Sequence, residues 1–504
     1  MAKVAEDITF EPITEGVIAD STVSYYVSPK NSVSSCENFN NDILGVLTYR
    51  IPLGLQFVPE ATNNVSAVLF QPAALANRIY YQVNQSLLWR DAGTPTTATT
   101  YTSIFQSNYQ PRYSIIQGNL LMTCGSLSGI KYTTGASAPV VIAGISGTPT
   151  DIDLIDAGFG GRIWYGSSTN ANNRVYYTDV IPAAGVASTT GTSQYLTINA
   201  NNGDYVTGLI QGQQVLYAFT TNGIFRIYNT QSQDNVPLAF VGAPNQESIA
   251  KGTDGIYFYH STGFYKLTDG GTVQLISNRI KSIIPRYTNP VRVWSVGDFV
   301  YFSFYYDFAV TGAGSNLGSK VFRYTISTQT WTVYNFFKNI IYATTTSLDR
   351  SNTRRTYLFG SSGGANSTFA SIFEEQERGD GSISTSSASG DDNSEIQIIG
   401  SFETNWENFG MESHIKQING IAYPSSNATG FDVAYQVDNA NPSHWIPIGK
   451  LTDKTITLFK DFVSVPFNRI RFRVMGQKKN PYSGGSFCSI GSPTIMKLTD
   501  KGYE

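Results

Sequence analysis

The sequence predicts an all-β protein, with a β-propeller of six or seven blades over residues 46–375 and a β-sandwich over residues 396–504. The first observation is a strand–turn–strand pattern that recurs through the middle of the chain. The second is the composition: 14% of the 504 residues are charged, and 31 Tyr and 29 Phe accompany 46 Gly. Aromatic residues favour the pleated surface of a sheet, and glycines favour turns. The third is that no long stretch has the amphipathic spacing of a helix.

The recurring pattern is an aromatic-rich strand, a short polar turn and a second strand. Successive copies start about 41 to 51 residues apart, and a period of ~40–45 residues with several short strands per unit is typical of propeller blades. Two glycines, Gly223 and Gly263, lie between paired strands, where a positive φ is expected. The copies begin at Asn77, Gly118, Gly161, Gly212, Asp254 and Gly297.

Before the repeats, residues 1–45 lack periodicity and are predicted to form an extended N-terminal arm. The first strand is predicted at residues 46–57. Two blades are predicted to carry loop insertions, at residues 179–203 and 308–319. Repeat folds accept such insertions because loops lie at the surface.

The repeat pattern breaks at residues 360–394, which are rich in Ser and Gly. This composition predicts a linker over residues 376–395, and residues 369–373 form a candidate last blade strand. The block after the linker contains short alternating strands, which is typical of a sandwich. These strands are predicted at residues 396–403, 415–423, 431–437, 456–462 and 469–474.

The charge balance argues against a nucleic-acid-gripping surface. The formal net charge is −3 and the pI is about 5.8, so there is no basic excess to hold phosphates. The three cysteines, Cys36, Cys124 and Cys488, are too far apart for a disulfide framework or a metal site. We also expect no secretory signal and no membrane-spanning stretch.

Motifs for catalysis are weak. The three histidines form no zinc-binding pattern, residues 125–129 place Leu127 where a nucleophile elbow needs Ser, and residues 158–161 lack the full dinucleotide-binding motif. The acidic run that contains Glu374 and Glu377 could supply paired carboxylates for glycoside cleavage. A solvated loop explains this run better, because its flanks resemble linkers. We therefore expect no catalytic residue, no metal and no cofactor.

One charged face stands out in the predicted sandwich. In the strand at residues 469–474, Arg469, Arg471 and Arg473 point to one side and apolar residues point to the other. A plain solvent-exposed face would explain this alternation. It is also the best candidate in the chain for an electrostatic docking face, continued by Lys478 and Lys479.

Several segments, taken in order, resemble the tail hub or nozzle proteins of short-tailed bacteriophages, also called packaged-DNA stabilisation proteins. The resemblance extends over most of the chain, while the linker and the insertion at residues 179–203 depart from it. The segments that carry it are residues 38–50, 203–209, 215–219, 223–226, 248–250, 254–258, 263–265, 276–281 and 398–404, with Lys416.

This resemblance implies a structural virion protein of the short tail, made in the host cytoplasm, and not an enzyme. Six copies would form the distal tail ring, which retains the packaged DNA and conducts it at ejection without sequence-specific binding. Implied partners are the tail adaptor and portal complex above, tail fibres and further copies of the chain. The alternative is a receptor- or glycan-binding propeller on the virion surface, with Trp89, Trp164 and Trp331 as sugar platforms. A glycan hydrolase using Glu374 and Glu377 is a third possibility.

Overall fold

The computed structural model describes most of the 504 residues. The described residues are 4–9, 17–18, 32–37, 39–43, 46–49, 53–57, 67–70, 78–83, 85–91, 99–106, 109, 111–125, 129–135, 137–143, 145, 152–168, 173–183, 185–188, 194–198, 204–284, 292–307, 317–336, 339–348, 354–364, 367–375, 400–409, 414–438, 444–452, 455–476, 482–483 and 486–503.

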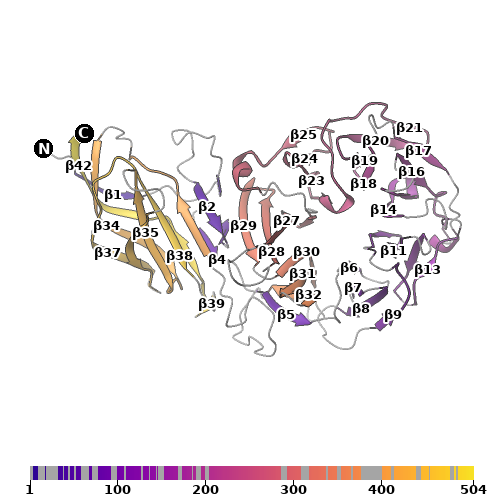
Figure 1. The fold of residues 1–504 in the computed structure, drawn as a ribbon, viewed down its shortest axis with the longest axis horizontal. Helices are drawn as coiled ribbons and strands as arrows, with labels where there is room; N and C mark the ends of the chain where they lie inside the picture. Colours follow the sequence, from indigo (N-terminus) through magenta and orange to yellow (C-terminus); the bar gives the residue numbers. More distant parts are fainter. Residues whose placement is uncertain are drawn as a thin grey trace.

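The described strands confirm the all-β class and form a propeller with seven four-stranded blades joined to a sandwich (Figure 1). Within each blade the strands follow one another from the axis outward, and all neighbours are antiparallel. Blade 1 consists of β6 (Ala67–Phe70), β7 (Arg78–Val83), β8 (Ser86–Asp91) and β9 (Thr99–Tyr101). Blade 2 consists of β10 (Tyr113–Ile116), β11 (Asn119–Thr123), β12 (Ile130–Thr133) and β13 (Val140–Val141). Blade 3 is β14 (Leu154–Ala157), β15 (Ile163–Gly166), β16 (Arg174–Tyr177) and β17 (Tyr195–Thr197).

Blades 4 to 6 follow the same order, and blade 7 takes its outermost strand from earlier in the chain. Blade 4 consists of β18 (Val206–Gln211), β19 (Leu216–Thr220), β20 (Ile224–Asn229) and β21 (Ser232–Gln233). Blade 5 consists of β22 (Ile249–Lys251), β23 (Ile256–His260), β24 (Gly263–Leu267) and β25 (Val273–Leu275). Blade 6 is β26 (Arg292–Val296), β27 (Phe299–Asp307), β28 (Leu317–Thr325) and β29 (Thr330–Phe336). Blade 7 is β30 (Asn339–Leu348), β31 (Arg354–Gly364), β32 (Ser367–Glu375) and β5 (Leu53–Phe57).

The repeat seen in the sequence is the second strand of successive blades. All five residues of β11 and of β19 are buried, because a middle strand of a blade is covered on both faces by its neighbours. A strand buried on both faces needs a near-continuous apolar run. This requirement explains why the second strands carried the clearest signal, while short outer strands such as β13 and β21 carried none.

Blade 7 closes the ring with a strand from the other end of the propeller sequence. The outermost strand, β5, pairs with β32 through Phe57 and Ile372 and through Leu53 and Glu375. The expected single strand at residues 46–57 is therefore wrong: β4 (Val46–Tyr49) belongs to the sandwich, and β5 belongs to blade 7. Hydrogen bonds across the joint hide strand edges that would otherwise be open.

Two expected irregular segments contain blade strands. The presumed insertion at residues 179–203 includes β17, the outer strand of blade 3. The presumed break at residues 360–394 begins inside β31 and includes β32, so the candidate strand at residues 369–373 is part of blade 7. The small polar residues of these segments are typical of loops and misled the prediction, yet β31 and β32 carry Ser, Thr and Gly within paired strands. The predicted linker and residues 308–316 of the second insertion lie outside the described residues.

The sandwich takes strands from both ends of the chain. One sheet has the order β1 (Val4–Thr9), β42 (Thr494–Tyr503), β34 (His414–Ser426), β41 (Ser489–Gly491), β4 and β3 (Phe39–Ile43), and β37 (Ile456–Val463) also pairs with β34. The other contains β2 (Val33–Glu37), β33 (Gly400–Thr404), β38 (Ile470–Gly476), β35 (Phe431–Val437) and β36 (Ile446–Lys450). A small hairpin, β39 (Tyr482–Ser483) and β40 (Ser486–Phe487), stands apart. The N-terminal arm is thus corrected to strands of the sandwich.

Propeller and sandwich are joined by shared backbone and core. Strand β2 pairs with β29 of blade 6 on one side and with β33 on the other, so one nine-stranded sheet runs from blade 6 into the sandwich. A single hydrophobic cluster includes Phe302 and Trp331 of blade 6 and Phe402 and Phe431 of the sandwich. A continuous sheet and a shared core couple the two parts mechanically.

The two turn glycines differ in their backbone requirements. Gly263 has φ 147°, and a Cβ there would lie 2.5 Å from Ser277 Oγ. Gly223 is absent from the described residues with positive φ, so the expectation for that turn is wrong. A Cβ at Gly223 would still lie 3.2 Å from Pro237 Cβ.

We expect Gly263→Ala to lower the free energy of unfolding by about 1–3 kcal/mol, because it combines an unfavourable φ with a steric clash. Urea unfolding followed by tryptophan fluorescence measures this difference. Gly270→Ala is the control, since a Cβ at Gly270 would meet nothing nearer than 3.9 Å. Equal losses in the two variants would contradict the explanation.

Candidate functional site: the charge cluster inside the propeller ring

Three charged residues from separate blades meet inside the ring. Arg112 precedes β10 of blade 2, Glu247 lies in the short 3-10 helix η4 (Gln246–Ser248) before β22 of blade 5, and Arg292 begins β26 of blade 6. Each residue stands at the start of an innermost strand. Because innermost strands of a propeller run in the same direction, the three side chains share one rim of the ring.

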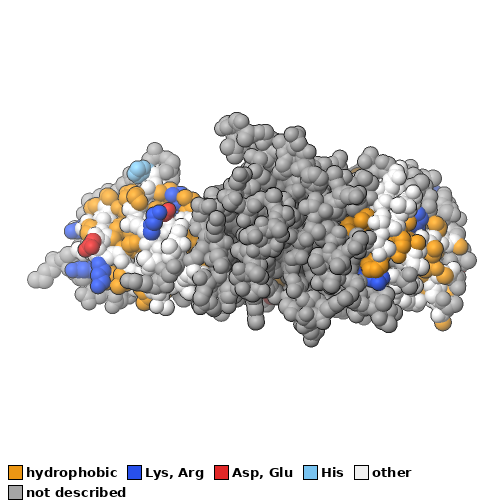
Figure 2. Space-filling model, turned by 90° about the horizontal axis from the view of Figure 1, so that it is seen from below, with side chains coloured by type: hydrophobic (Ala, Val, Ile, Leu, Met, Phe, Trp, Pro, Cys, Tyr) orange, Lys and Arg blue, Asp and Glu red, His pale blue; other side chains and the backbone are white. Residues whose placement is uncertain are grey.

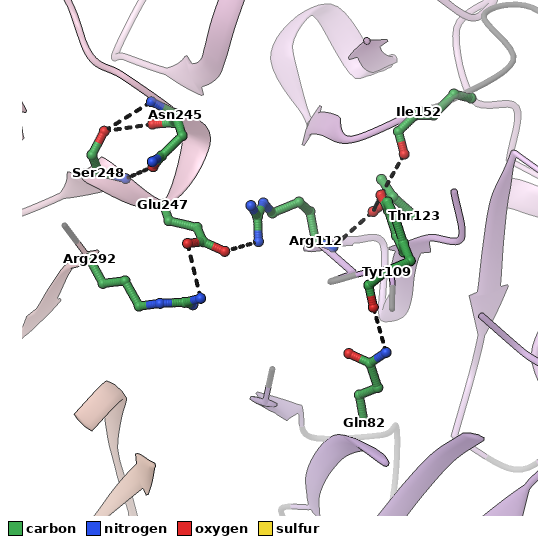
Figure 3. A network of polar contacts seen from close by, with 9 residues as sticks. All are labelled: Gln82, Tyr109, Arg112, Thr123, Ile152, Asn245, Glu247, Ser248 and Arg292. Carbon is green, nitrogen blue, oxygen red and sulfur yellow. Dashed lines mark hydrogen bonds and ion pairs between the residues drawn. The ribbon is translucent and has the colours of Figure 1, made fainter. Parts of the chain in front are cut away.

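Glu247 binds both arginines. Arg112 Nη1 donates to Glu247 Oε1, and Arg292 Nη2 lies 3.1 Å from Glu247 Oε2 (Figure 3). Blades 2 and 5 are not neighbours in the ring, so this ion pair reaches across its interior. We call Arg112, Glu247 and Arg292 the axial cluster.

Backbone and side-chain contacts hold both ends of the axial cluster. On one side, Asn245 and Ser248 cap η4: Ser248 N donates to Asn245 Oδ1 over 2.9 Å, and Ser248 Oγ donates to Asn245 O over 2.7 Å. This cap fixes the direction of Glu247 between them. The helical turn thereby presents a carboxylate toward the ring interior.

On the other side, Arg112 N donates to Thr123 Oγ1 over 2.8 Å. Tyr109 Oη donates to Ile152 O over 2.6 Å and lies 2.7 Å from Thr123 Oγ1, while Gln82 Nε2 donates to Tyr109 O over 2.6 Å (Figure 3). These bonds join blades 1, 2 and 3 behind Arg112.

The electrostatics of the axial cluster favour ionised groups. Burial raises the pKa of the Glu247 carboxyl, but the charges of Arg112 and Arg292 outweigh burial, and the pKa lies below its ordinary value. Two cations and one anion leave a local charge of about +1. The cluster offers no nucleophile and no proton-transfer group near neutral pH, so its chemistry is that of a structural clamp.

A second buried carboxylate lies between blades 3 and 4. Asp156 Oδ2 accepts from Gln211 N over 3.3 Å, and Oδ1 is buried with no hydrogen-bond partner in the part of the chain that the structure describes. Burial raises the pKa of Asp156 from 3.8 to about 7, although Gln211 N and Lys251 act in the opposite direction. Asp156 is near the end of β14, at the rim opposite the axial cluster.

This raised pKa predicts a pH dependence of stability. Because the folded state holds the proton more tightly than the unfolded state, the contribution of Asp156 is fully present below pH 3.8 and is lost as the pH rises to about 7. The Asp156→Asn variant should therefore have a higher free energy of unfolding than the native chain at pH 8, by about 1–2 kcal/mol. Near pH 4 the two free energies of unfolding should be equal. Urea unfolding at both pH values tests this, with the exposed Asp432→Asn as control. A constant difference across pH would contradict it.

The predicted docking face is a stack of alternating Arg and Trp side chains on the sandwich. Arg469 and Arg471 lie over Trp406, at 5.5 and 4.9 Å from the ring centre, and Arg471 and Arg473 lie over Trp445, at 5.0 and 4.5 Å. The sequence predicts the three arginines on one side of the strand at residues 469–474 but gives no sign of the tryptophans, which come from distant segments. We call these five residues the Arg–Trp ladder.

Acidic and amide groups complete the ladder. Arg471 Nη1 lies 3.2 Å from Glu403 Oε2, and Arg471 Nε donates to Gln436 Oε1 over 2.8 Å. Arg469 Nε lies 3.6 Å from Asp438 Oδ2. Burial lowers the pKa of Arg471, with Glu403 acting in the opposite direction. At least two of the three charges are therefore engaged within the chain, and less charge faces solvent than the sequence suggested.

We expect Arg471→Met to lower the free energy of unfolding by about 1–3 kcal/mol, because it removes two cation–π contacts and leaves Glu403 without its partner. The comparison is Lys450→Met, which removes an exposed ion pair with Asp432, 3.7 Å long, and should change stability by less than about 1 kcal/mol. Chemical denaturation of both variants measures the difference, and similar effects would refute a structural role for the ladder.

Other residues considered in the sequence do not assemble into a site among the described residues. Trp164 and Trp331 are fully buried core residues, so they cannot serve as sugar platforms. Arg78 covers Trp89, with its Cζ atom 3.5 Å from the centre of the ring. The side chain of Glu374 and the whole of Glu377 lie outside the described residues. Among the residues that the structure describes, no group of His, Cys, Asp and Glu is arranged for a metal ion. Cys36, Cys124 and Cys488 are buried and form no disulfide.

Sequence reasoning missed the axial cluster. Arg112, Glu247 and Arg292 are each ordinary in sequence, and nothing local indicates that they meet. Their sequence positions gave no usable signal, because the repeat visible in the sequence is the second strand of each blade, whereas these residues lie beside first strands.

Comparison with known proteins gives structural neighbours of low similarity and no family. No protein-family model and no curated protein matches the chain. Among solved structures, it is similar to the Pan2 WD40 domain of Neurospora crassa, at 9% identity and TM-score 0.36 over 65% of this chain and 90% of that chain. It is also similar to the Cps50 (Swd1) β-propeller domain of Myceliophteria thermophila, at 10% identity and TM-score 0.39 over 63% and 98%. No helix among the described residues is long and apolar enough to span a membrane.

Proposed function

We propose that this chain is a structural virion protein of a short-tailed bacteriophage, six copies of which form the distal tail ring that retains packaged DNA and conducts it at ejection. The observation that carries the proposal is the axial cluster. The ion pair from Glu247 of blade 5 to Arg112 of the non-adjacent blade 2 spans the ring interior. Arg292 of the neighbouring blade 6 adds a second ion pair, so charged side chains lie across the interior of the propeller ring. DNA would therefore pass between subunits, around a shared axis.

Two further features support a structural part. The continuous sheet through β29, β2 and β33 makes propeller and sandwich one elongated unit. Such a unit suits a subunit that stands side by side with identical copies in the wall of a ring. The low charged fraction of 14% and the net charge of −3 suit a surface past which DNA slides without being held. In this proposal the sandwich meets the tail adaptor and portal complex, and tail fibres attach around the ring.

The test is genetic complementation in the phage that encodes the chain. Particles assembled without this chain should package DNA and then lose it, and a plasmid copy of the native chain should restore DNA retention and infectivity. Retention of DNA by particles that lack the chain would overturn the proposal. Charge reversal of Arg469, Arg471 and Arg473 is unsuitable as the test, because it would disrupt the Arg–Trp ladder itself.

A further inference from the structure

Strand β37 of the sandwich has a pattern of exposed and buried side chains that is the same in either chain direction. From residue 455 to residue 466, the burial pattern mirrors itself about the bond between Lys460 and Asp461: both of these are exposed, Phe459 and Phe462 are half-buried, and Thr457 and Ser464 are buried. The strand is anchored to β34 on both sides of this midpoint, through Ile421 with Phe459 and through Asn419 with Val463. The register shift between these pairs turns exposed side chains on both halves to the same side.

The chemical character of the exposed side chains follows the same symmetry. Four apolar residues remain about half exposed: Ile456 (52%), Leu458 (48%), Val463 (56%) and Val465 (48%). Reversal of the strand places Ile456 on Val465, Leu458 on Val463 and Lys460 on Asp461. Every apolar side chain thus meets an apolar one, and each charge meets its opposite.

We propose that residues 456–465 are a self-complementary interface that binds the same strand of a second copy of this chain in the antiparallel direction. A two-fold contact requires one patch to complement itself, and the reversed strand satisfies this requirement at every exposed position. Lys460 and Asp461 form no ion pair with any described residue of their own chain, so both charges are available to the second copy. The partner is a second copy because an unrelated protein would not require this mirror symmetry.

The position of the strand leaves it accessible. Strand β37 lies at the end of the molecule away from the propeller (Figure 1). The view from below shows hydrophobic side chains on the sandwich interspersed with charged ones (Figure 2). This interface is a two-fold contact, so it is separate from the closing contacts of a six-membered ring, and it does not depend on the proposed function.

The contact should be weak, with a dissociation constant on the order of 100 μM, since one strand per copy covers less than the ~1,200–2,000 Å² of a standard interface. Sedimentation velocity of the full chain over a range of concentrations measures it. Lys460→Asp alone and Asp461→Lys alone should each weaken dimerisation at least tenfold, because like charges then face each other. The double variant Lys460→Asp/Asp461→Lys should restore it, and so should an equimolar mixture of the two single variants.

Met475→Ser is the matched control, because Met475 is 40% exposed on β38 of the other sheet and should leave the dissociation constant unchanged. Thermal unfolding of each variant excludes misfolding as the cause of weaker association. A chain that stays monomeric at millimolar concentration would overturn the proposal. Association that survives both single charge changes, or that the mixture fails to restore, would also overturn it.

Discussion

Replacement of Glu247 by Gln should lower the free energy of unfolding by about 3–5 kcal/mol, the largest effect expected of any conservative change in the propeller. The substitution preserves shape but leaves Arg112 and Arg292 as neighbouring cations without their shared anion. Urea unfolding followed by tryptophan fluorescence measures the loss. The exposed Asp432→Asn, which also removes a carboxylate from an ion pair, should cost less than about 1 kcal/mol.

The same variant carries a pH signature. Because the pKa of Glu247 in the folded state lies below the ordinary 4.5, its contribution is present above pH 4.5 and is lost as the pH falls through the lower folded value. The stabilities of native chain and Glu247→Gln should converge in acid and separate at neutral pH. A triple variant with Met at both arginine positions and Leu at position 247 should recover much of the loss, since apolar replacement of a whole buried cluster is often neutral. Failure of the curves to converge would contradict an ionised clamp.

Replacement of Phe264 by Ala should cost about 3–5 kcal/mol through the cavity that it leaves. Phe264 is fully buried at the junction of blades 5 and 6. Its ring stacks on Phe302 with centres 4.1 Å apart and lies 5.4 Å from Trp331. Differential scanning calorimetry or urea unfolding detects the loss.

The matched control is Phe240→Ala, because Phe240 is 83% exposed on blade 4 and its removal should change stability by less than about 0.5 kcal/mol. Equal effects at the two positions would show that the junction core does not hold the blades together. The comparison separates loss of packing from loss of an aromatic side chain as such.

The parts of the fold that local pattern determines were predictable. Middle blade strands such as β19 and β23 are recognised because burial on both faces demands apolar runs, and β35 was predicted at its observed bounds of Phe431–Val437. What pattern could not reveal was pairing between distant segments. Strand β5 closes blade 7, and β1 to β4 enter the sandwich, through backbone hydrogen bonds that almost any polar or apolar strand can make.

The candidate site shows the same limit. The alternation of Arg469, Arg471 and Arg473 was legible in one strand, but the Trp406 and Trp445 rings that cover them come from other segments. The axial cluster depends on ring closure, which brings Arg112 to Glu247 across 135 positions of sequence. Only three-dimensional proximity reveals such a contact.

The most direct test of the proposed function is electron cryo-microscopy of phage particles that contain this chain. We expect six copies around the tail axis, DNA or an open path on that shared axis between subunits, and each propeller clamped by Arg112, Glu247 and Arg292. Density for DNA along the axis of a single propeller, or a chain located outside a distal tail ring, would contradict the account.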